Sequence, residues 1–283
     1  MNILVTGASS QIGKCLLPML DEKDCACTCI SRKGHLGDTN ITWLKADMTT
    51  GMMNVWQEKN QSAIWIHLGF LPLATSHLKA AFESGIKRFI GFSSTSVITK
   101  KDTDSGEERL TIQRLLEAEK EVQSQCETFG IAWTLFRPTM IYGYGMDQNI
   151  AFIQSAISRF GMFPLAGKTK GLRQPVHAED LAKACVQVLQ SDNARNKVYN
   201  LSGGEVLSYH AMVERVFRSM NREPRIICVP PSMYKLAITL LKLLSSRYAF
   251  VQTTMVDRMN IDMAFDHSDA KADFDYSPRA FQP

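Results

Sequence analysis

The sequence predicts an α/β fold, in which helices cover both faces of a doubly wound parallel sheet and a smaller, mostly helical C-terminal lobe follows. Two observations support this prediction. Strand-like and helix-like stretches alternate over the first half of the chain, as a parallel sheet with crossover helices requires. Beyond about residue 138, glycines interrupt the pattern, and helical spacing of apolar residues dominates towards the C-terminus.

Each element is predicted from its local pattern. The apolar run 3–5 is the first strand, and apolar residues at helical spacing over 12–20 predict the first helix. Ser105 and Glu108 have the spacing of a capping box, which marks the start of the longest helix. Further strands of the sheet are expected at 26–31, 41–46, 63–67, 88–92, 132–136, 175–177 and 198–201. Further helices are expected at 73–84, 105–129, 150–160, 179–190 and after Ser208.

Residues 6–13, Thr-Gly-Ala-Ser-Ser-Gln-Ile-Gly, form a turn between the first predicted strand and helix. In this context the first glycine permits a tight turn and the last lets the helix pack closely on the strand. The helix N-terminus then presents free N–H groups and its positive dipole end to a pyrophosphate. An ordinary tight turn would also use glycine, and Ser10 stands where such loops have a middle glycine. The loop nevertheless favours nucleotide binding, because the rest of the chain has the matching order of elements.

Composition excludes several classes of function. The 32 Lys and Arg residues against 28 Asp and Glu leave a net charge of +4, and no basic run exceeds two residues. This argues against nucleic acid as the partner. The seven cysteines lack the paired spacing of a zinc site and suit a reducing, cytoplasmic location. No apolar run approaches the ~20 residues that span a bilayer, so we expect no membrane span.

The order of motifs along nearly the whole chain resembles the extended short-chain dehydrogenases/reductases, the family of NAD-dependent epimerases and dehydratases that act on nucleotide sugars. Thr6, Gly7 and Gly13 match its Thr-Gly-x-x-Gly-x-x-Gly fingerprint. Other segments that resemble its motifs are 46–48, 66–69, 92–97, 137–143, 173–180 and 200–204. Each match is short, and their order and spacing together make the resemblance specific.

The resemblance implies a Rossmann-like nucleotide-binding domain at 1–145 plus about 173–201, and a substrate-binding lobe at about 146–172 and 202–283. It also implies which residues bind the ligands. The expected cofactor-binding residues are Thr6, Gly7, Ser9, Ser10, Gln11, Ile12, Gly13, Arg32, Lys33, Asp47, Met48, Leu68, Gly69, Phe70, Ser93 and Pro138. Asn149 and Arg173 are the expected substrate-binding residues; the alternatives are a helix N-cap for Asn149 and a surface position for Arg173. His177 in this motif is more often structural than catalytic.

The usual catalytic pair of the family is absent. A Tyr-x-x-x-Lys pair on the long helix normally supplies a phenolate base, and its lysine holds the ribose and lowers the pKa of the tyrosine. The resemblance puts Thr111 at the tyrosine position and Leu115 at the lysine position. No tyrosine precedes Tyr142 in the chain, and none has a lysine four residues later.

Two hypotheses on function therefore remain open. The first is an enzyme, an atypical NAD(P)-dependent epimerase, dehydratase or reductase acting on a nucleotide sugar or a similar polar metabolite, as a monomer or homodimer. Ser94 matches the family's catalytic serine, and Tyr142 is a candidate for the missing acid or base. The second is a protein that binds NADP(H) without turnover, as a sensor or structural subunit. The missing pair favours the second; Ser94, Arg173 and the glycine-rich lobe favour the first, towards which we lean.

The residues after the second strand predict the cofactor preference. Ser31-Arg32-Lys33 places two cations there, and no carboxylate that would accept from a ribose 2′-OH. We therefore expect NADP(H) as the cofactor, with NAD(H) as the alternative. Arg32→Ala should reduce the difference between the affinities for NADP(H) and NAD(H). Calorimetry with both dinucleotides measures it, and equal affinities for the unmodified protein would contradict the prediction. The alternative is an exposed basic turn.

Overall fold

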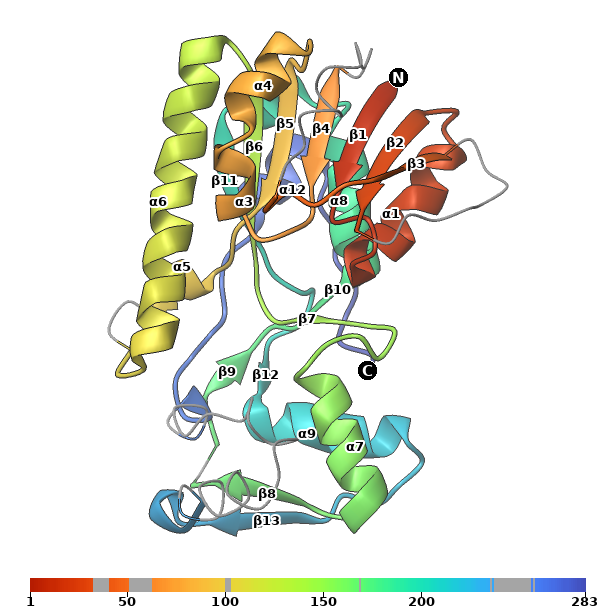
Figure 1. Ribbon diagram of the computed structural model, residues 1–283. Coiled ribbons are helices and arrows are strands. Elements are labelled where there is room, and N and C mark those ends of the chain that lie inside the picture. The colour runs from red at the N-terminus through yellow and green to blue at the C-terminus, as the bar shows by residue number, and fades with distance from the viewer. Residues whose placement is uncertain are drawn as a thin grey trace.

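The computed structural model describes residues 1–32, 41–50, 63–99, 103–167, 169–234 and 258–283, together with Leu236 and Val256. The chain forms two halves, one around a sheet and one smaller (Figure 1). The sheet that the described residues form has seven strands in the order β11-β6-β5-β4-β1-β2-β3, and all neighbouring strands are parallel. The predicted Rossmann-like α/β fold is confirmed.

The strands of the sheet lie where the apolar runs predict them. They are β1 (Asn2–Thr6), β2 (Ala26–Ser31), β3 (Ile41–Lys45), β4 (Ile64–His67), β5 (Arg88–Phe92), β6 (Ala132–Pro138) and β11 (Lys197–Leu201). Alternate residues of β1 face opposite sides of the sheet: Ile3 and Val5 belong to one buried cluster and Leu4 to the other. Such runs, apolar on both faces, are typical of parallel strands covered on both sides.

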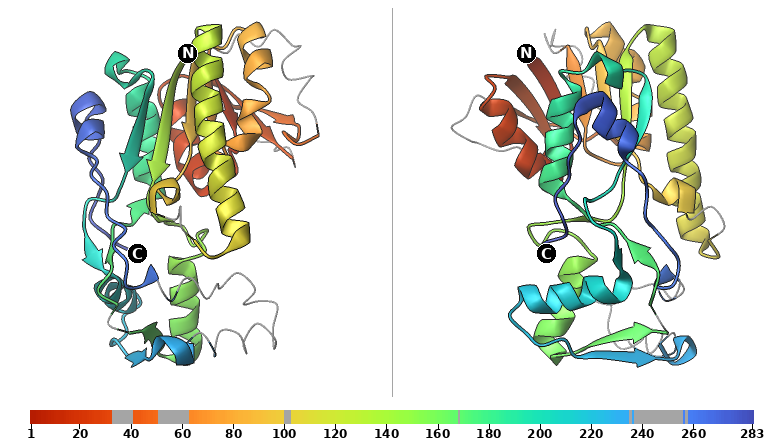
Figure 2. Two further views of the ribbon diagram at one scale, coloured as in Figure 1. Left: turned by 90° about the vertical axis from the view of Figure 1, so that its left-hand side faces the viewer. Right: turned by 180° about the vertical axis from the view of Figure 1, so that it is seen from behind.

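Helices cover both faces of the sheet. On one side α1 (Gln11–Asp21), α8 (Ala178–Val188) and α12 (Ser268–Phe274) contribute to the first cluster, and the view from behind in Figure 2 shows these three helices in front of the sheet. On the other side lie α3 (Pro72–Thr75), α4 (Leu78–Glu83), α5 (Ser96–Thr99) and α6 (Gly106–Phe129). The single helix predicted at 73–84 is wrong, because it breaks after Thr75, whose hydroxyl donates to the carbonyl of Pro72 at 3.2 Å.

The strand order reverses between β1 and β4. From β1 the sheet continues through β2 to β3, and from β4 it continues through β5 and β6 to β11. The loops that follow β1 and β4 therefore leave the same edge of the sheet in opposite directions. In open α/β sheets, this switch point is where ligands bind.

The smaller half combines two helices with short strand pairs. The helices are α7 (Ile150–Phe160) and α9 (Tyr209–Ser219), and both contribute to a third buried cluster. The strands are β8 (Phe163–Ala166) with β13 (Ile226–Val229), β9 (Leu172–Arg173) with β12 (Leu207–Ser208), and β7 (Ile141–Tyr142) with β10 (Val176–His177). The short helix Asp192–Ala194 precedes β11.

The prediction that 175–177 joins the main sheet is wrong. The two residues of β10 pair with β7 instead, and the N–H of Val176 donates to the carbonyl of Met140 at 2.9 Å. The prediction that 198–201 joins the main sheet is confirmed, because β11 pairs with β6. Period-two patterns do not identify the partner of so short a strand.

The C-terminal segment returns to the sheet. Phe274 and Tyr276 lie in the same buried cluster as α1 and α8, and the Tyr276 hydroxyl donates to the carbonyl of Ser202 at 3.0 Å. The segment 202–283 therefore contributes to both halves. No helix among the described residues is long and apolar enough to cross a membrane.

The long helix α6 begins and ends as the sequence predicts. The Ser105 hydroxyl accepts from the N–H of Glu108 at 3.4 Å, and Gly130 ends the helix with φ 70°. An ion pair then fixes α6 to the sheet: Arg137 Nε of β6 donates to Glu119 Oε1 at 2.9 Å, and the Glu119 side chain is only 4% exposed. This pair is an interaction between residues distant in sequence that sequence periodicity does not reveal.

Replacing Glu119 should destabilise the fold. Glu119→Ala leaves the Arg137 guanidinium without its carboxylate, which should lower the free energy of unfolding by about 2–3 kcal/mol. Glu117→Ala, on the exposed side of the same helix, should change it by less than about 0.5 kcal/mol. Urea denaturation followed by circular dichroism measures both. Equal losses for the two variants would show that the ion pair contributes nothing specific.

Candidate functional site

The loop between β1 and α1 lies against the loop that follows β4. Gly7 has φ +75°, and a Cβ added there would lie 2.8 Å from the N atom of Gly69 and 2.9 Å from the carbonyl carbon of Leu68. At Gly13 an added Cβ would lie 2.0 Å from the carbonyl oxygen of Ala8. Gly7 thus permits the turn and the approach of the two loops, and Gly13 permits the close packing of α1 on the turn.

Ser10 caps α1 where the fingerprint has a glycine. Its N–H donates to the carbonyl of Gly7 at 3.0 Å, and its hydroxyl accepts from the N–H of Gly13 at 3.2 Å. None of the hydrogen bonds among the described residues uses the N–H groups of Gln11 and Ile12. These two donors at the positive end of the helix dipole are suited to a phosphate group.

A buried hydrogen-bond network lies beneath the two loops. Trp65 Nε1 donates to Thr6 Oγ1 at 2.9 Å, and Thr6 Oγ1 lies 2.7 Å from His67 Nδ1. His67 Nε2 lies 3.1 Å from the carbonyl oxygen of Phe70, which can only accept. The neutral ring therefore carries its proton on Nε2, and Thr6 donates to Nδ1. Burial lowers the pKa of His67 to about 4.

Polar groups follow β2 and β3 on one side of the switch point. Asp47 Oδ1 accepts from the Thr49 N–H at 2.9 Å and from the Thr49 hydroxyl at 2.8 Å. These bonds, with a smaller effect of the nearby Arg32 cation, lower the pKa of Asp47. Arg32 is exposed at the end of β2, and His77 Nε2 binds the carbonyl of Met48 at 3.0 Å. Arg32 thus lies close enough to Asp47 for its charge to act on the carboxylate; Lys33 lies outside the described residues.

On the other side, two serines follow β5. The N–H of Ser93 donates to the carbonyl of Phe136 at 2.7 Å, while its buried hydroxyl has no partner among the described residues. Ser94 Oγ accepts from the N–H of Ser96 at 3.1 Å, which leaves its own proton for another acceptor. The carbonyl of Pro138 accepts from the Thr95 hydroxyl at 3.0 Å.

The two positions of the missing pair offer no substitute for it. Thr111 is exposed, and its hydroxyl donates to the carbonyl of Glu107 in its own helix at 3.0 Å. Leu115 is 7% exposed and belongs to the same buried apolar cluster as Leu71 at the start of α3 and Val97 in α5. Neither residue supplies a charge or a free donor to the site.

Arg173, an expected substrate-binding residue, is buried. Its guanidinium donates to the carbonyls of Leu172 at 2.7 Å and Ile261 at 2.8 Å, and also to the carbonyl of Arg258. It lies 5.1 Å from the centroid of the Tyr209 ring, and burial lowers its pKa. The donors of Arg173 therefore bind backbone carbonyls within the smaller half.

Asn149, the other expected substrate-binding residue, precedes α7 without a side-chain capping bond. Asp147 caps this helix instead: its Oδ1 accepts from the N–H groups of Asn149 at 2.9 Å, of Ala151 at 3.3 Å and of Ile150. Sequence reasoning missed Asp147, although aspartate is a preferred residue at helix N-termini. The Asn149 side chain makes no hydrogen bond to the other described residues.

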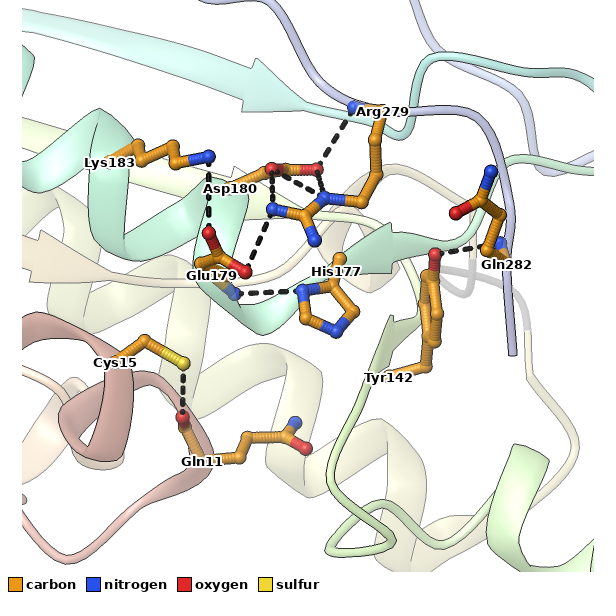
Figure 3. Close-up of polar contacts among 9 residues, drawn as sticks. All are labelled: Gln11, Cys15, Tyr142, His177, Glu179, Asp180, Lys183, Arg279 and Gln282. Atoms are coloured by element: carbon orange, nitrogen blue, oxygen red, sulfur yellow. Dashed lines mark hydrogen bonds and ion pairs between the residues drawn. The ribbon is translucent and has the colours of Figure 1, made fainter.

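Tyr142 lies in the core. It is 2% exposed, and its ring packs edge-on against His177 at 5.1 Å and Phe281 at 4.9 Å. Its hydroxyl accepts from the Gln282 N–H at 3.1 Å (Figure 3), and burial raises its pKa. His177 caps α8 by accepting from the Glu179 N–H at 3.2 Å. These contacts favour structural roles for both residues.

Tyr144 lies two residues after Tyr142 and is exposed. It is 59% exposed and has φ +59°. Its ring centroid lies 5.4 Å from that of His177. A hydrogen bond with the Cys15 thiol raises the pKa of Tyr144 to about 12. At neutral pH its hydroxyl is therefore protonated, which makes it a poor base.

An ion pair that sequence reasoning missed joins the two halves beside the start of α6. Arg258 of the smaller half pairs with Glu108, whose Oε2 also accepts from the Thr103 hydroxyl at 2.7 Å. The two side chains are 16% and 13% exposed. Glu108 lies one helical turn before Thr111, so the pair adjoins the position of the missing tyrosine. A contact between residues 150 positions apart leaves no signal in a single sequence.

Comparison with known proteins finds similarity to one family model and to several relatives. Residues 71–202 match the model of the NAD dependent epimerase/dehydratase family. A UDP-glucose 4-epimerase of Vibrio cholerae is 26% identical over 210 residues, 71% of this chain and 61% of that protein. Subunit 9 of the NADH dehydrogenase [ubiquinone] 1 alpha subcomplex, mitochondrial, of Arabidopsis thaliana is 29% identical over 98 residues, 34% of this chain and 24% of that protein. The matches thus span less than two thirds of each relative.

The fold is that of solved epimerases. UDP-glucuronic acid 4-epimerase from Bacillus cereus, in complex with UDP-glucuronic acid and NAD, superimposes with a TM-score of 0.74 and 16% identity over 99% of this chain and 95% of that chain. UDP-glucose 4-epimerase of Thermotoga maritima, with UDP-glucose, gives a TM-score of 0.73 and 16% identity over 99% of this chain and 94% of that chain.

The buried His67 should make the stability depend on pH. Its pKa is about 4 in the folded protein against a usual 6.5, so the unfolded chain binds the proton more readily between these values. Stability should be fully present above pH 6.5 and fall by about 3 kcal/mol as the pH decreases towards 4. His67→Gln should remove this part of the dependence in urea titrations at several pH values. His210→Gln, at a partly exposed position, is the control; an unchanged pH dependence in His67→Gln would contradict the assignment.

Proposed function

We propose that the protein is an atypical member of the NAD dependent epimerase/dehydratase family, whose model residues 71–202 match, and that it binds NADP(H) and acts on a nucleotide sugar or a similar polar metabolite. The observation that carries the proposal is the pair of loops at the switch point. An added Cβ at Gly7 would strike the Gly69 loop, and two N–H groups of α1 face outward without partners among the described residues. This arrangement suits a pyrophosphate.

Residues that follow three further strands, β2, β3 and β5, also suit a dinucleotide. Arg32 and Asp47 follow β2 and β3, where an adenosine and its 2′-phosphate would lie. The unpartnered hydroxyl of Ser93 and the free proton of Ser94 follow β5, towards the other end of the site. The bacterial epimerase of similar fold is a complex with NAD; the preference of this chain for NADP rests on Arg32 and on the absence of a carboxylate at Ser31 and Arg32.

When bound, the nicotinamide supplies reversible hydride transfer. The part of this chain in such a reaction is to orient the substrate and to move its proton. Ser94 accepts from the Ser96 N–H, so its hydroxyl proton is directed to another acceptor, and a substrate oxygen would be that acceptor. Because α6 has Thr111 and Leu115 at the usual positions, the group that moves the proton lies outside this helix.

A second candidate function is a protein that holds NADP(H) without turning it over. It is favoured by the contacts of Thr111 and Leu115, which stand at the positions of the family's Tyr and Lys. The Thr111 hydroxyl is bonded to its own helix, and Leu115 is part of the core. A subunit of NADH dehydrogenase is among the relatives with similar sequence. Turnover measurements separate the two functions.

We expect negligible 4-epimerase or dehydratase turnover on common UDP- and dTDP-sugars, although NADP binds. General acid–base assistance is typically worth ~10²–10⁴ in rate, and an alkyl hydroxyl at Thr111 cannot provide it. Chromatographic assays of sugar conversion, with calorimetry of NADP as the binding measurement, test this expectation.

Any turnover that is found should depend on groups outside α6. Ser94→Ala should then reduce kcat, and Tyr142→Phe tests the other candidate; Thr111→Val is the matched control and should have no effect. Turnover at ordinary epimerase rates that neither Ser94→Ala nor Tyr142→Phe changes would show that the site lies elsewhere.

A further inference from the structure

An exposed apolar face lies at the end of the smaller half that is farthest from the seven-stranded sheet, where α7 leads into β8 (Figure 1). Phe160 at the end of α7 is 56% exposed, Met162 is 42% exposed, and Ile227 of β13 is 46% exposed. Pro164 of β8, the cross-strand neighbour of Ile227, is exposed as well. Neighbours in register point to the same side of a strand pair, so Pro164 and Ile227 share one outer side. We refer to Phe160, Met162, Pro164 and Ile227 as the distal face.

Arginines border the distal face. The Arg159 guanidinium lies 5.3 Å from the centroid of the Phe160 ring. Arg222 Nη1 donates to the carbonyl of Ile157 in α7 at 2.7 Å, so this side chain lies beside the end of the same helix. The carbonyl of Arg225 accepts from the N–H of the first residue of β8 at 3.0 Å. Three cations are thus held next to the elements that carry the apolar side chains.

The charge of this region is strongly positive. Residues 157–165 and 217–229 contain four arginines and one acidic residue, Glu223, which gives a net charge of +3 (four less one). The arginines, all exposed, are Arg159, Arg218, Arg222 and Arg225. The region therefore combines exposed hydrocarbon with guanidinium groups, which are well suited to bind phosphate.

This combination fits an anionic membrane surface better than it fits other partners. Apolar patches rimmed by polar groups mark contacts with proteins or membranes. A second copy of the chain, docked on the same face, would bring two strongly positive surfaces together, and like charges repel. A nucleic acid would use the arginines but would leave Phe160 and Met162 against a charged backbone. Lipid headgroups supply phosphates for the arginines, and the acyl chains accept the apolar side chains.

We infer that the distal face docks reversibly on a membrane surface that contains anionic lipid. Phe160 and Met162 enter the boundary between headgroups and acyl chains, and the bordering arginines bind lipid phosphates. Each cation near such a surface adds about fivefold in affinity. The inference does not depend on the proposed nucleotide binding, because the distal face belongs to the smaller half and not to the loops that follow β1 and β4.

Co-sedimentation of the full chain with vesicles tests the inference. One set of vesicles contains phosphatidylcholine alone, and the other contains phosphatidylcholine and phosphatidylglycerol in equal amounts. We expect the protein to bind the second set at least about tenfold more tightly than the first, and to be released when sodium chloride screens the charges. Failure to bind the anionic vesicles at low salt would overturn the inference.

Matched variants test whether the distal face is the surface that binds. Phe160→Ser removes the exposed ring and should weaken binding to the anionic vesicles by about tenfold; Arg225→Gln should weaken it by about fivefold. The controls are Leu110→Ser and Arg114→Gln on α6, where both side chains are also exposed, and neither should change binding. Thermal denaturation followed by circular dichroism shows whether each variant is folded. Equal losses in the variants and the controls would overturn the assignment to the distal face.

Two further measurements test the other occupants. A dimer in sedimentation equilibrium that Phe160→Ser dissociates, without binding to vesicles, would assign the distal face to a second copy of the chain and overturn the inference. Binding of polyuridylate RNA that Arg225→Gln weakens, again without binding to vesicles, would assign the arginines to a nucleic acid and overturn it as well.

Discussion

The site depends on the hydrogen-bonded contact of Thr6, Trp65 and His67 beneath the two loops at the switch point. These side chains end β1 and β4, the two strands between which the order of the sheet reverses. His67 extends this hydrogen-bond network into the second loop, because its Nε2 binds the carbonyl of Phe70. With all three groups buried, each bond is costly to break. The positions of the Gly7 and Gly69 loops, and with them the outward direction of the α1 N–H groups, follow from this contact.

The parts of the structure that could be predicted from sequence are those that local chemistry determines. The apolar runs located β1 to β6, and Ser105 located the start of α6, because caps and strand patterns need only neighbouring residues. The glycine loop could be recognised for the same reason. By contrast, the partner of β10, the capping of α7 by Asp147 and the pairing of Glu108 with Arg258 depend on contacts or loop conformations that no periodicity encodes. Residue type alone also could not show that Arg173 and Tyr142 are buried.

The fold is independent of the family's catalytic pair. Glu119 holds α6 to β6 through Arg137, and the apolar residues Leu115, Ala118 and Val122 pack the same helix on the sheet. Burying a leucine stabilises a fold by about 1.5–3 kcal/mol, whereas a buried lysine needs a partner to offset its desolvation. At position 115 the chain thus has a residue that stabilises the packing of α6.

In the smaller half, Arg173 is likewise used to stabilise the structure. Arg173 directs its guanidinium to the carbonyls of Leu172, Ile261 and Arg258, and it thereby fixes the backbone that presents the Arg258 side chain. That side chain crosses to Glu108 at the start of α6. Arg173, which the sequence analysis expects to bind a substrate, thus supports the backbone of Arg258. The Arg258 side chain in turn joins the two halves beside Thr111. Because Glu108, one helical turn before Thr111, pairs with Arg258 and accepts from the Thr103 hydroxyl, its carboxylate stabilises the arrangement of the two halves.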